Sequence, residues 1–302
     1  MLEQKKPFNF TRTRSDFMSQ GVRCAADLYL PTAVDKPPIV IMAHGLGAER
    51  SFALPAYAEY FANQGMAVLL FDYRCFGDSD GKPRQLVLPT HHLQDWQAAM
   101  RHVQSIPTVD TGRIALWGSS YSGGHVIVTA AKEPSIAALV SQVPAVDSLQ
   151  HLLGKGLGFI LKVTVHGIYD VLRMVIGLSA HCVPLIGKPK EFAVLNSHDA
   201  YDGYMSLVPE GSTWENKVPA RLALTAPYRP IKSAAKVSCP ALVVIAENDS
   251  IIPATLQEEM AAKISKAEVV KYPIGHFDIY TGDKFEETVR TQAAFLKKHL
   301  YD

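Results

Sequence analysis

The sequence has almost no excess of charge of either sign. Its 302 residues hold 30 Lys and Arg against 29 Asp and Glu, which gives a formal net charge of +1. Proteins that bind nucleic acid or an anionic membrane surface through bulk electrostatics carry a clear basic excess. Neither a nucleic acid nor a membrane is therefore expected as a partner.

Cysteine is scarce and scattered. The four cysteines stand singly, without the Cys-x-x-Cys spacing of zinc and redox sites: Cys24, Cys75, Cys182 and Cys239. This pattern predicts no metal site and fits a reducing compartment. Residues 1–17 also lack the apolar stretch of a secretory leader, so we expect a cytoplasmic protein.

An uninterrupted hydrophobic run of membrane-spanning length is also missing. The longest apolar stretch covers residues 151–187 and is broken by charged side chains and a histidine: Lys155, Lys162, His166, Asp170 and Arg173. A membrane span needs about 20 predominantly apolar residues in a row. The stretch suits a helical lid better, because long excursions from a compact fold are usually of that kind.

What the sequence does contain is an alternation of short apolar runs and segments with helical spacing. The runs are rich in Val, Ile and Leu and cover residues 39–43, 66–72, 113–118, 136–143, 241–247 and 267–273. Continuous apolar runs suit strands buried on both faces, and helices between them imply a mostly parallel sheet. We predict an α/β fold with helices at 53–65 and 92–106. Residues 13–17 and 22–31 are expected to form an antiparallel edge.

The alternation breaks between residues 147 and 235. Because α/β domains often exceed the usual domain size, we predict one large domain with an insertion. Residues 1–146 and 236–302 would form the α/β core, and residues 147–235 a helical cap.

The stretch GDSDG at residues 77–81 spells the Gly-x-Ser-x-Gly pattern of a nucleophilic serine. That pattern needs a strand directly before the serine and a helix directly after it. The preceding apolar run ends at Asp72, and Pro83 and Pro89 offer no helix. The carboxylates of Asp78 and Asp80 would also oppose the negative charge that develops during catalysis. We interpret GDSDG as a turn and Ser79 as non-catalytic.

The stretch RIALWGSSYSGGHV has the required context, an apolar run followed by a segment that can start a helix. Ser120 is the preferred nucleophile, because the residues two positions before and after it, Gly118 and Ser122, are small. Ser119 would place Trp117 at the first of those positions. The pattern also permits Ser122, but it lies two residues too far from the end of the strand.

A serine nucleophile needs a base and an orienting carboxylate. Asp249 follows the run 241–247, and His276 follows the run 267–273, so both belong to the carboxyl edge of a parallel sheet. The chain order Ser, Asp, His is that of α/β-hydrolases. Glu247 is an alternative acid, although it falls where the strand is still paired.

Backbone donors for an oxyanion are expected beside the nucleophile. The glycines of MAHGLGAER let the chain turn tightly after residues 39–43, so the N–H of Leu46 can point inward. The second donor is the N–H of Tyr121, directly after the nucleophile. His44 is interpreted as a support for this loop and His125 as a packed structural residue.

The chain resembles the α/β-hydrolase superfamily, in particular bacterial dienelactone-hydrolase-related and Xaa-Pro dipeptidase-like hydrolases that are akin to fungal polyketide transferases and thiohydrolases. The matching stretches are AHGLGAE, LLFDYRCFGDSDGKPRQ, RIALWGSSYSGGHV, LVSQVPAVD, ALVVIAENDSIIP and YPIGHFDIY, within residues 22–300. The resemblance implies an α/β-hydrolase fold, a nucleophile at Ser120 and a structural turn at GDSDG. It is weakest in the cap, which sets substrate choice in such enzymes.

These observations predict a serine hydrolase that cleaves an ester or thioester of a small to medium apolar acyl compound through an acyl-enzyme intermediate. No metal or organic cofactor is expected, and the expected partner is a small-molecule acyl substrate. An acyltransferase or a peptidase would use the same three residues, a non-catalytic binding protein is a further alternative, and a homo-oligomer is left open. Seven apolar cap residues suggest either an acyl pocket or the core of the cap itself: Phe159, Ile160, Val163, Ile168, Leu172, Met174 and Ile176.

Overall fold

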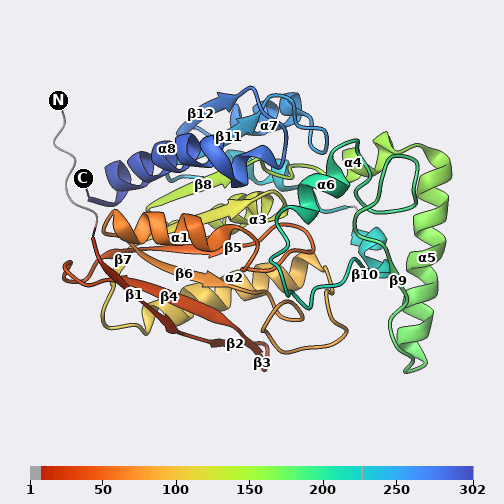
Figure 1. Cartoon of the computed structure of the whole chain (residues 1–302), viewed down its shortest axis with the longest axis horizontal. Coiled ribbons are helices and arrows are strands. Elements are labelled where there is room, and N and C mark those ends of the chain that lie inside the picture. Colours follow the sequence, from red (N-terminus) through yellow and green to blue (C-terminus); the bar gives the residue numbers. More distant parts are fainter. Residues whose placement is uncertain (1–7, 226, 302) are drawn as a thin grey trace.

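The computed structural model describes residues 8–225 and 227–301, and its centre is an eight-stranded sheet (Figure 1). In spatial order the strands are β1 (Phe10–Arg14), β4 (Ala26–Pro31), β6 (Ala67–Phe71), β5 (Pro38–Ala43), β7 (Asp110–Ser119), β8 (Ala138–Gln142), β11 (Ala241–Ala246) and β12 (Ala267–Tyr272). All pairs from β6 to β12 are parallel. The predicted α/β class and mostly parallel sheet are confirmed. The expectation that residues 1–17 hold no secretory leader falls partly on residues outside the described ranges.

The edge of the sheet is antiparallel, as predicted, but its strands are divided differently. Strand β4 pairs antiparallel with both β1 and β6, and a separate hairpin joins β2 (Phe17–Ser19) to β3 (Val22–Cys24). The two predicted runs therefore become four strands. Asp16 explains the break, because its carboxylate accepts the N–H of Ala26 at 3.0 Å and pairs with Arg23 at 2.7 Å.

Helices cover both faces of the sheet. The helices are α1 (Leu54–Asn63) and α8 (Gly282–Tyr301) on one face, and α2 (Pro89–Gln104), α3 (Tyr121–Ala130) and α7 (Ala254–Ala261) on the other. A hydrophobic core lies on each face of the sheet, and successive residues of a buried strand point alternately into the two cores. In β5, Ile39 and Ile41 pack with the α2 and α3 side, whereas Val40 and Met42 pack with the α1 and α8 side.

Helix α2 begins earlier than the sequence indicated. Its first residue is Pro89, which we had taken as evidence against a helix after GDSDG. Proline suits the first position of a helix, since its fixed φ is helical and the N–H that it lacks would have no partner there. The expectation that Pro89 excludes a helix was therefore wrong, although seven residues still separate it from Gly81.

Residues 147–235 lie beyond one end of the sheet (Figure 1). They contain α4 (Ser148–Gly154), α5 (Leu157–Val175), β9 (Cys182–Val183), α6 (Ala200–Met205), β10 (Val218–Pro219) and the 3-10 helices η1 (Ala220–Thr225), η2 (Pro230–Lys232) and η3 (Ala234–Lys236). Strands β9 and β10 form a small antiparallel pair. Helix α5 is the element farthest from the sheet in Figure 1.

The two ends of this segment are joined to each other. The N–H of Ser148 donates to the carbonyl of Tyr228, and the N–H of Ile231 donates to the carbonyl of Val146, both at 3.0 Å. The guanidinium of Arg229 contacts Asp147 at 2.7 Å. Residues 146–148, where the segment begins, and residues 228–231, near its end, are therefore held together by these contacts.

The outer face of α5 is exposed and apolar. Of the seven apolar residues singled out in the sequence, only Phe159 and Val163 face the main cavity. Ile168, Leu172, Met174 and Ile176 are 48–69% exposed, so they form neither an acyl pocket nor a core. Across the described part of the chain, no helix combines the length and the hydropathy needed to cross a bilayer.

Candidate active site

Ser120 lies at an abrupt turn between β7 and α3. Strand β7 ends at Ser119, α3 begins at Tyr121, and Ser120 has φ 55° and ψ −118°. This left-handed region is strained for a residue with a side chain and recurs at functional sites. Gly118 permits the turn, because a Cβ built on it would lie 2.3 Å from the carbonyl oxygen of Ser122. The turn displays the Ser120 side chain at the carboxyl edge of the sheet.

The structure brings Ser120, His276 and Asp249 together. The Nε2 atom of His276 lies 3.1 Å from Ser120 Oγ, and its Nδ1 lies 2.7 Å from Asp249 Oδ2. Because a carboxylate can only accept, Nδ1 carries the proton and Nε2 of the neutral ring is free to accept one from the serine. The three side chains thus form a continuous hydrogen-bonded chain.

Two sheet strands deliver the histidine and the aspartate. Asp249 follows β11, and its Oδ1 accepts the N–H groups of Ile251 and Ile252 at 2.8 Å, which fixes the carboxylate. His276 follows β12 and is buried. Glu247, the alternative acid, is exposed, and it is Asp249 that contacts the imidazole.

The competing serines have structural contacts instead. The hydroxyl of Ser79 donates to the carbonyl of Asp72 and accepts the N–H of Ala25, both at 2.8 Å, so Ser79 is a buried anchor of the GDSDG turn. The Oγ of Ser119 lies 2.5 Å from the hydroxyl of Tyr280. The Oγ of Ser122 lies 2.8 Å from the hydroxyl of Tyr73. Ser120 alone of the four contacts a histidine in the described structure.

The loop after β5 passes directly over the nucleophile. A Cβ built on Gly45 would lie 3.1 Å from Ser120 Cβ, so any side chain at this position would crowd the nucleophile. Leu46 follows and lines the cavity together with Ser120 and Tyr121. The loop therefore brings Leu46 to the same cavity wall as Ser120 and Tyr121, the first residue of α3.

Two aromatic residues from the 147–235 segment hold this loop. The hydroxyl of Tyr204 donates to the carbonyl of Leu46 at 3.0 Å, and the indole N–H of Trp214 donates to the carbonyl of Gly47 at 2.8 Å. Neither contact was predicted, because the partners are more than 150 residues apart in the sequence and no local pattern links them. The 147–235 segment thus fixes two carbonyl groups of this loop.

Behind the nucleophile lies a buried row of imidazole and phenol groups. His125 contacts His92 (Nε2 to Nδ1, 3.1 Å) and the hydroxyl of Tyr228 (2.6 Å from Nδ1), which supports the structural role expected for His125. Burial lowers the pKa of His125 to about 3 and also lowers the pKa of His44. His44 lies beside Gly45 at the base of the loop, as expected for a supporting residue. These imidazoles are neutral at physiological pH.

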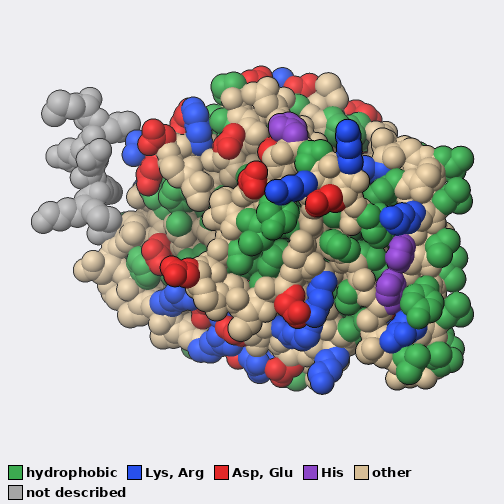
Figure 2. All heavy atoms as spheres, turned by 45° about the vertical axis from the view of Figure 1, so that its right-hand side comes forward, with side chains coloured by type: hydrophobic (Ala, Val, Ile, Leu, Met, Phe, Trp, Pro, Cys, Tyr) green, Lys and Arg blue, Asp and Glu red, His purple; other side chains and the backbone are tan. Residues whose placement is uncertain are grey.

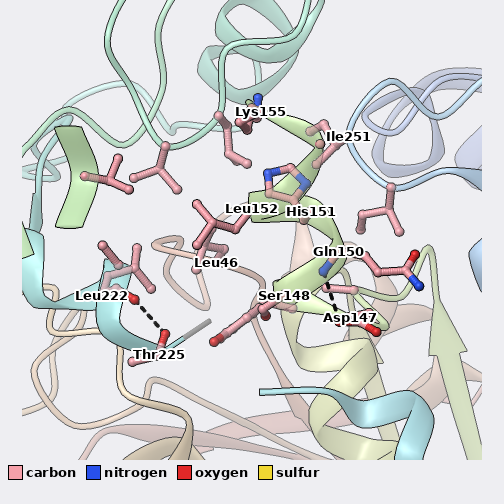
Figure 3. A pocket seen from close by; sticks show the side chains of 18 of the residues that line it. Leu46, Asp147, Ser148, Gln150, His151, Leu152, Lys155, Leu222, Thr225 and Ile251 are labelled. Atoms are coloured by element: carbon pink, nitrogen blue, oxygen red, sulfur yellow. Dashed lines mark hydrogen bonds between the residues drawn. The ribbon is translucent and has the colours of Figure 1, made fainter. Parts of the chain in front are cut away.

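A cavity of about 500 Å³ opens from Ser120 toward α4 and α5. Its walls are mostly apolar, and Figure 3 shows Leu46, Leu152, Leu222 and Ile251 around it. Helix α4 forms one wall, and Asp147 caps this helix by accepting the N–H groups of Leu149 and Gln150 at 3.1 Å. An apolar cavity of this size suits a small to medium organic ligand.

A smaller recess of about 40 Å³ lies on the other side of the nucleophile. Ser120 and Leu46 line both spaces, but His276 lines only the recess. Among residues 8–225 and 227–301, no three His, Cys, Asp or Glu side chains come together as a metal site would require.

Comparisons with known proteins identify the family. The model of the X-Pro dipeptidyl-peptidase (S15) family matches residues 20–181, more than half of the chain. The quorum-quenching protein AidA of Acinetobacter baumannii (strain MDR-ZJ06) is 38% identical over 283 residues, 93% of each chain. The polyketide transferase af380 of Aspergillus fumigatus is 26% identical over 277 residues, 87% of this chain and 90% of the transferase.

The fold is also that of solved α/β-hydrolases. The crystal structure of the α/β-hydrolase GrgF from Penicillium sp. sh18 superposes with a TM-score of 0.81 at 23% identity, covering 97% of this chain and 100% of GrgF. The resemblance that the sequence motifs indicated is therefore confirmed. This chain belongs to the X-Pro dipeptidyl-peptidase (S15) family and is a hydrolase with the α/β-hydrolase fold.

Proposed function

We propose that the protein is a serine hydrolase that cleaves an ester or thioester of a small to medium apolar acyl compound. The observation that carries this proposal is the hydrogen-bonded chain from Ser120 through His276 to Asp249 at the wall of an apolar cavity. A serine is a weak nucleophile until a base takes its proton, and this arrangement supplies the base and its orienting acid.

In the proposed mechanism Ser120 Oγ attacks the substrate carbonyl while His276 Nε2 takes the hydroxyl proton. Asp249 orients the ring and stabilises the imidazolium. The N–H groups of Leu46 and Tyr121 would hold the oxyanion, each worth a few kcal/mol of barrier, and the N-terminus of α3 adds its positive dipole end. His276 then protonates the leaving alcohol or thiol, and water, activated by the same histidine, hydrolyses the acyl-enzyme.

The two spaces beside Ser120 support an orientation for the substrate. The leaving group must reach His276 to receive its proton, and His276 lines the small recess. The acyl chain would then occupy the larger apolar cavity. We propose further that residues 147–235 act as a cap on a core of residues 1–146 and 236–302, since α4, α5 and η1 supply much of the cavity wall.

A peptidase that anchors the amino terminus of its substrate is less well supported. An ammonium group needs a free carboxylate, and Asp147 is the one acidic residue among the described lining of the cavity. Asp147 is already occupied by Arg229 and by the N-terminus of α4. Acyl transfer to an alcohol or amine uses the same three residues, and product analysis with an added acceptor separates it from hydrolysis.

The test compares two serines of the same turn. We expect Ser120→Ala to lose fluorophosphonate labelling, read by intact mass, and to lose at least about a thousandfold in kcat/KM toward p-nitrophenyl esters. Ser122→Ala is the matched control and should keep the label. A wild-type protein that takes no label, or loses it only in Ser122→Ala, would falsify the proposal. Because one relative is named a quorum-quenching protein, esters that act as bacterial quorum signals form a second set of substrates to assay.

A further inference from the structure

The cavity has one feature that an apolar acyl chain does not explain, a lysine at its far end. Lys155 follows α4 and lines the cavity. Its ammonium donates to the amide oxygen of Asn196 at 2.7 Å and lies 6.0 Å from the centre of the Phe159 ring. Within the described residues, no carboxylate comes within 4.0 Å of it. Both of its contacts are to uncharged groups.

This makes Lys155 unlike the buried cations elsewhere in the chain. Arg50, Arg74 and Arg221 each contact one or more carboxylates, with nitrogen-to-oxygen distances of 3.1, 2.7 and 2.6 Å to Asp27, Asp95 and Asp170. Withdrawing a cation from water is costly unless a counter-charge compensates. Burial lowers the pKa of Lys155, and no neighbouring carboxylate offsets this effect. The cavity therefore contains a partly desolvated cation without an anion.

Helix α4 aligns this cation with the nucleophile end of the cavity. Ser148, His151, Leu152 and Lys155 have the i, i+3, i+4, i+7 spacing of one helical face, and all four line the cavity. Figure 3 shows Ser148 and Lys155 at opposite ends of this row. Seven residues of helix correspond to about 10 Å. A ligand that lies along this row and reaches Lys155 must therefore span about 10 Å.

His151, between these ends, offers a second polar contact. Its Nε2 atom is buried and has no hydrogen-bond partner among the described residues. Burial, assisted by the charge of Lys155, lowers the pKa of His151 to about 4, so the ring is neutral. A neutral imidazole does not compete with Lys155 for an anion and can hydrogen-bond an oxygen on the chain.

We propose that the cavity accepts an extended acyl chain that carries a carboxylate at its far end, with Lys155 as the ion-pair partner of that carboxylate. This inference rests on the proposed function and names its substrate class: half-esters or thioesters of dicarboxylic acids. The apolar wall contacts the methylenes, the ester carbonyl lies at Ser120, and the distal carboxylate provides the negative charge that the protein itself does not place beside Lys155.

The test compares matched substrates that differ only in the distal charge. Mono-p-nitrophenyl esters of adipate, suberate and sebacate are assayed against the same esters with a methyl-capped distal carboxyl. A charge-assisted hydrogen bond contributes more than a neutral one, so we expect wild type to favour the free acid about tenfold in kcat/KM at one chain length, mainly through KM. Lys155→Met should abolish this preference, and Lys155→Arg should retain it.

Lys162→Met is the matched control, because Lys162 is a cation of α5 whose ammonium lies over the Phe192 ring rather than in the cavity lining. This variant should keep the wild-type preference. Equal turnover of free acid and methyl ester at every length, or an unchanged preference in Lys155→Met, would overturn the inference while leaving the proposed function intact. If no ester is hydrolysed, the proposed function fails, and calorimetric binding of suberate to wild type and Lys155→Met still decides the role of Lys155.

Discussion

At the scale of single residues, the backbone of Ser120 adopts a conformation that a residue with a side chain disfavours. Its φ of 55° is imposed by β7 before it and α3 after it. The position keeps a side chain despite a strain of order 1–3 kcal/mol, which only the surrounding structure can hold in place. Stability and proposed activity therefore make opposite demands on this residue.

We expect Ser120→Gly to be more stable than Ser120→Ala by about 1 kcal/mol, since glycine adopts this φ without strain. Urea unfolding of both variants measures the difference. The control pair is Ser122→Gly and Ser122→Ala, inside α3, where the order should reverse because glycine is the poorer helix former by about 1 kcal/mol. The same order at both sites would contradict a strained turn at Ser120.

At the scale of elements, α2 and α3 are joined by uncharged imidazoles. His92 lies in α2, His125 lies in α3, and Tyr228 extends the row to the 147–235 segment. In the folded protein the pKa of His125 is lowered to about 3, whereas an unfolded chain has a histidine pKa near 6.5. As the pH falls below about 6.5, the unfolded state binds a proton that the folded state does not.

The contribution of His125 to the free energy of unfolding should therefore be fully present above pH 6.5. It should be lost progressively between pH 6.5 and about 3, at up to about 1.4 kcal/mol per pH unit. Between pH 7 and pH 5 we expect His125→Gln to remove about 2 kcal/mol of the pH dependence of the free energy of unfolding. Tyr228→Phe, which loses the same hydrogen bond but keeps the titrating ring, should retain the dependence. If both variants behave alike, the dependence does not come from His125.

Some elements and contacts could be predicted from the sequence, and others could not. The strands followed from continuous apolar runs, and the meeting of Ser120, Asp249 and His276 followed from their positions after strand ends. The clamp of Tyr204 and Trp214 on the loop after β5 did not, because nothing local marks a contact between distant segments. The outward face of α5 was also missed, since apolar spacing predicts a helix with an apolar face but not what that face contacts.

At the scale of the whole molecule, the exposed apolar face of α5 has no contact that explains it within the described residues. Hydrophobic side chains gather along it in Figure 2. Five of them alternate in spacings of four and three residues: Leu161, Val165, Ile168, Leu172 and Val175, with exposures of 48–73%. This is the spacing of a seam between two helices. Leu157, Ile176 and Leu178 extend the face, which exceeds the scattered apolar exposure of an ordinary monomer.

We expect a second copy of the chain to cover this face, with the two α5 helices paired about a twofold axis. A helix of 19 residues is about 28 Å long, so neighbouring loops must complete the roughly 800 Å² per partner of a stable dimer. Light scattering after gel filtration should give a dimer for wild type and a monomer for the Val165→Lys, Leu172→Lys double variant. Val269→Lys, at an exposed position of β12, is the control. A monomeric wild type at micromolar concentration would exclude the pairing.

The closure between the two ends of the 147–235 segment has a consequence for building chimeras with relatives. Three contacts join the two ends: Tyr228 with Ser148, Arg229 with Asp147, and Ile231 with Val146. The hydroxyl of Tyr228 also contacts His125 behind the nucleophile. A chimera that exchanges all of residues 147–235 would replace Tyr228 but keep its partner His125, and would thus lose the contact between them. Splice points after Ser148 and before Tyr228 would keep all of these contacts within the recipient protein, so that the exchanged segment starts and ends at a junction that is already closed.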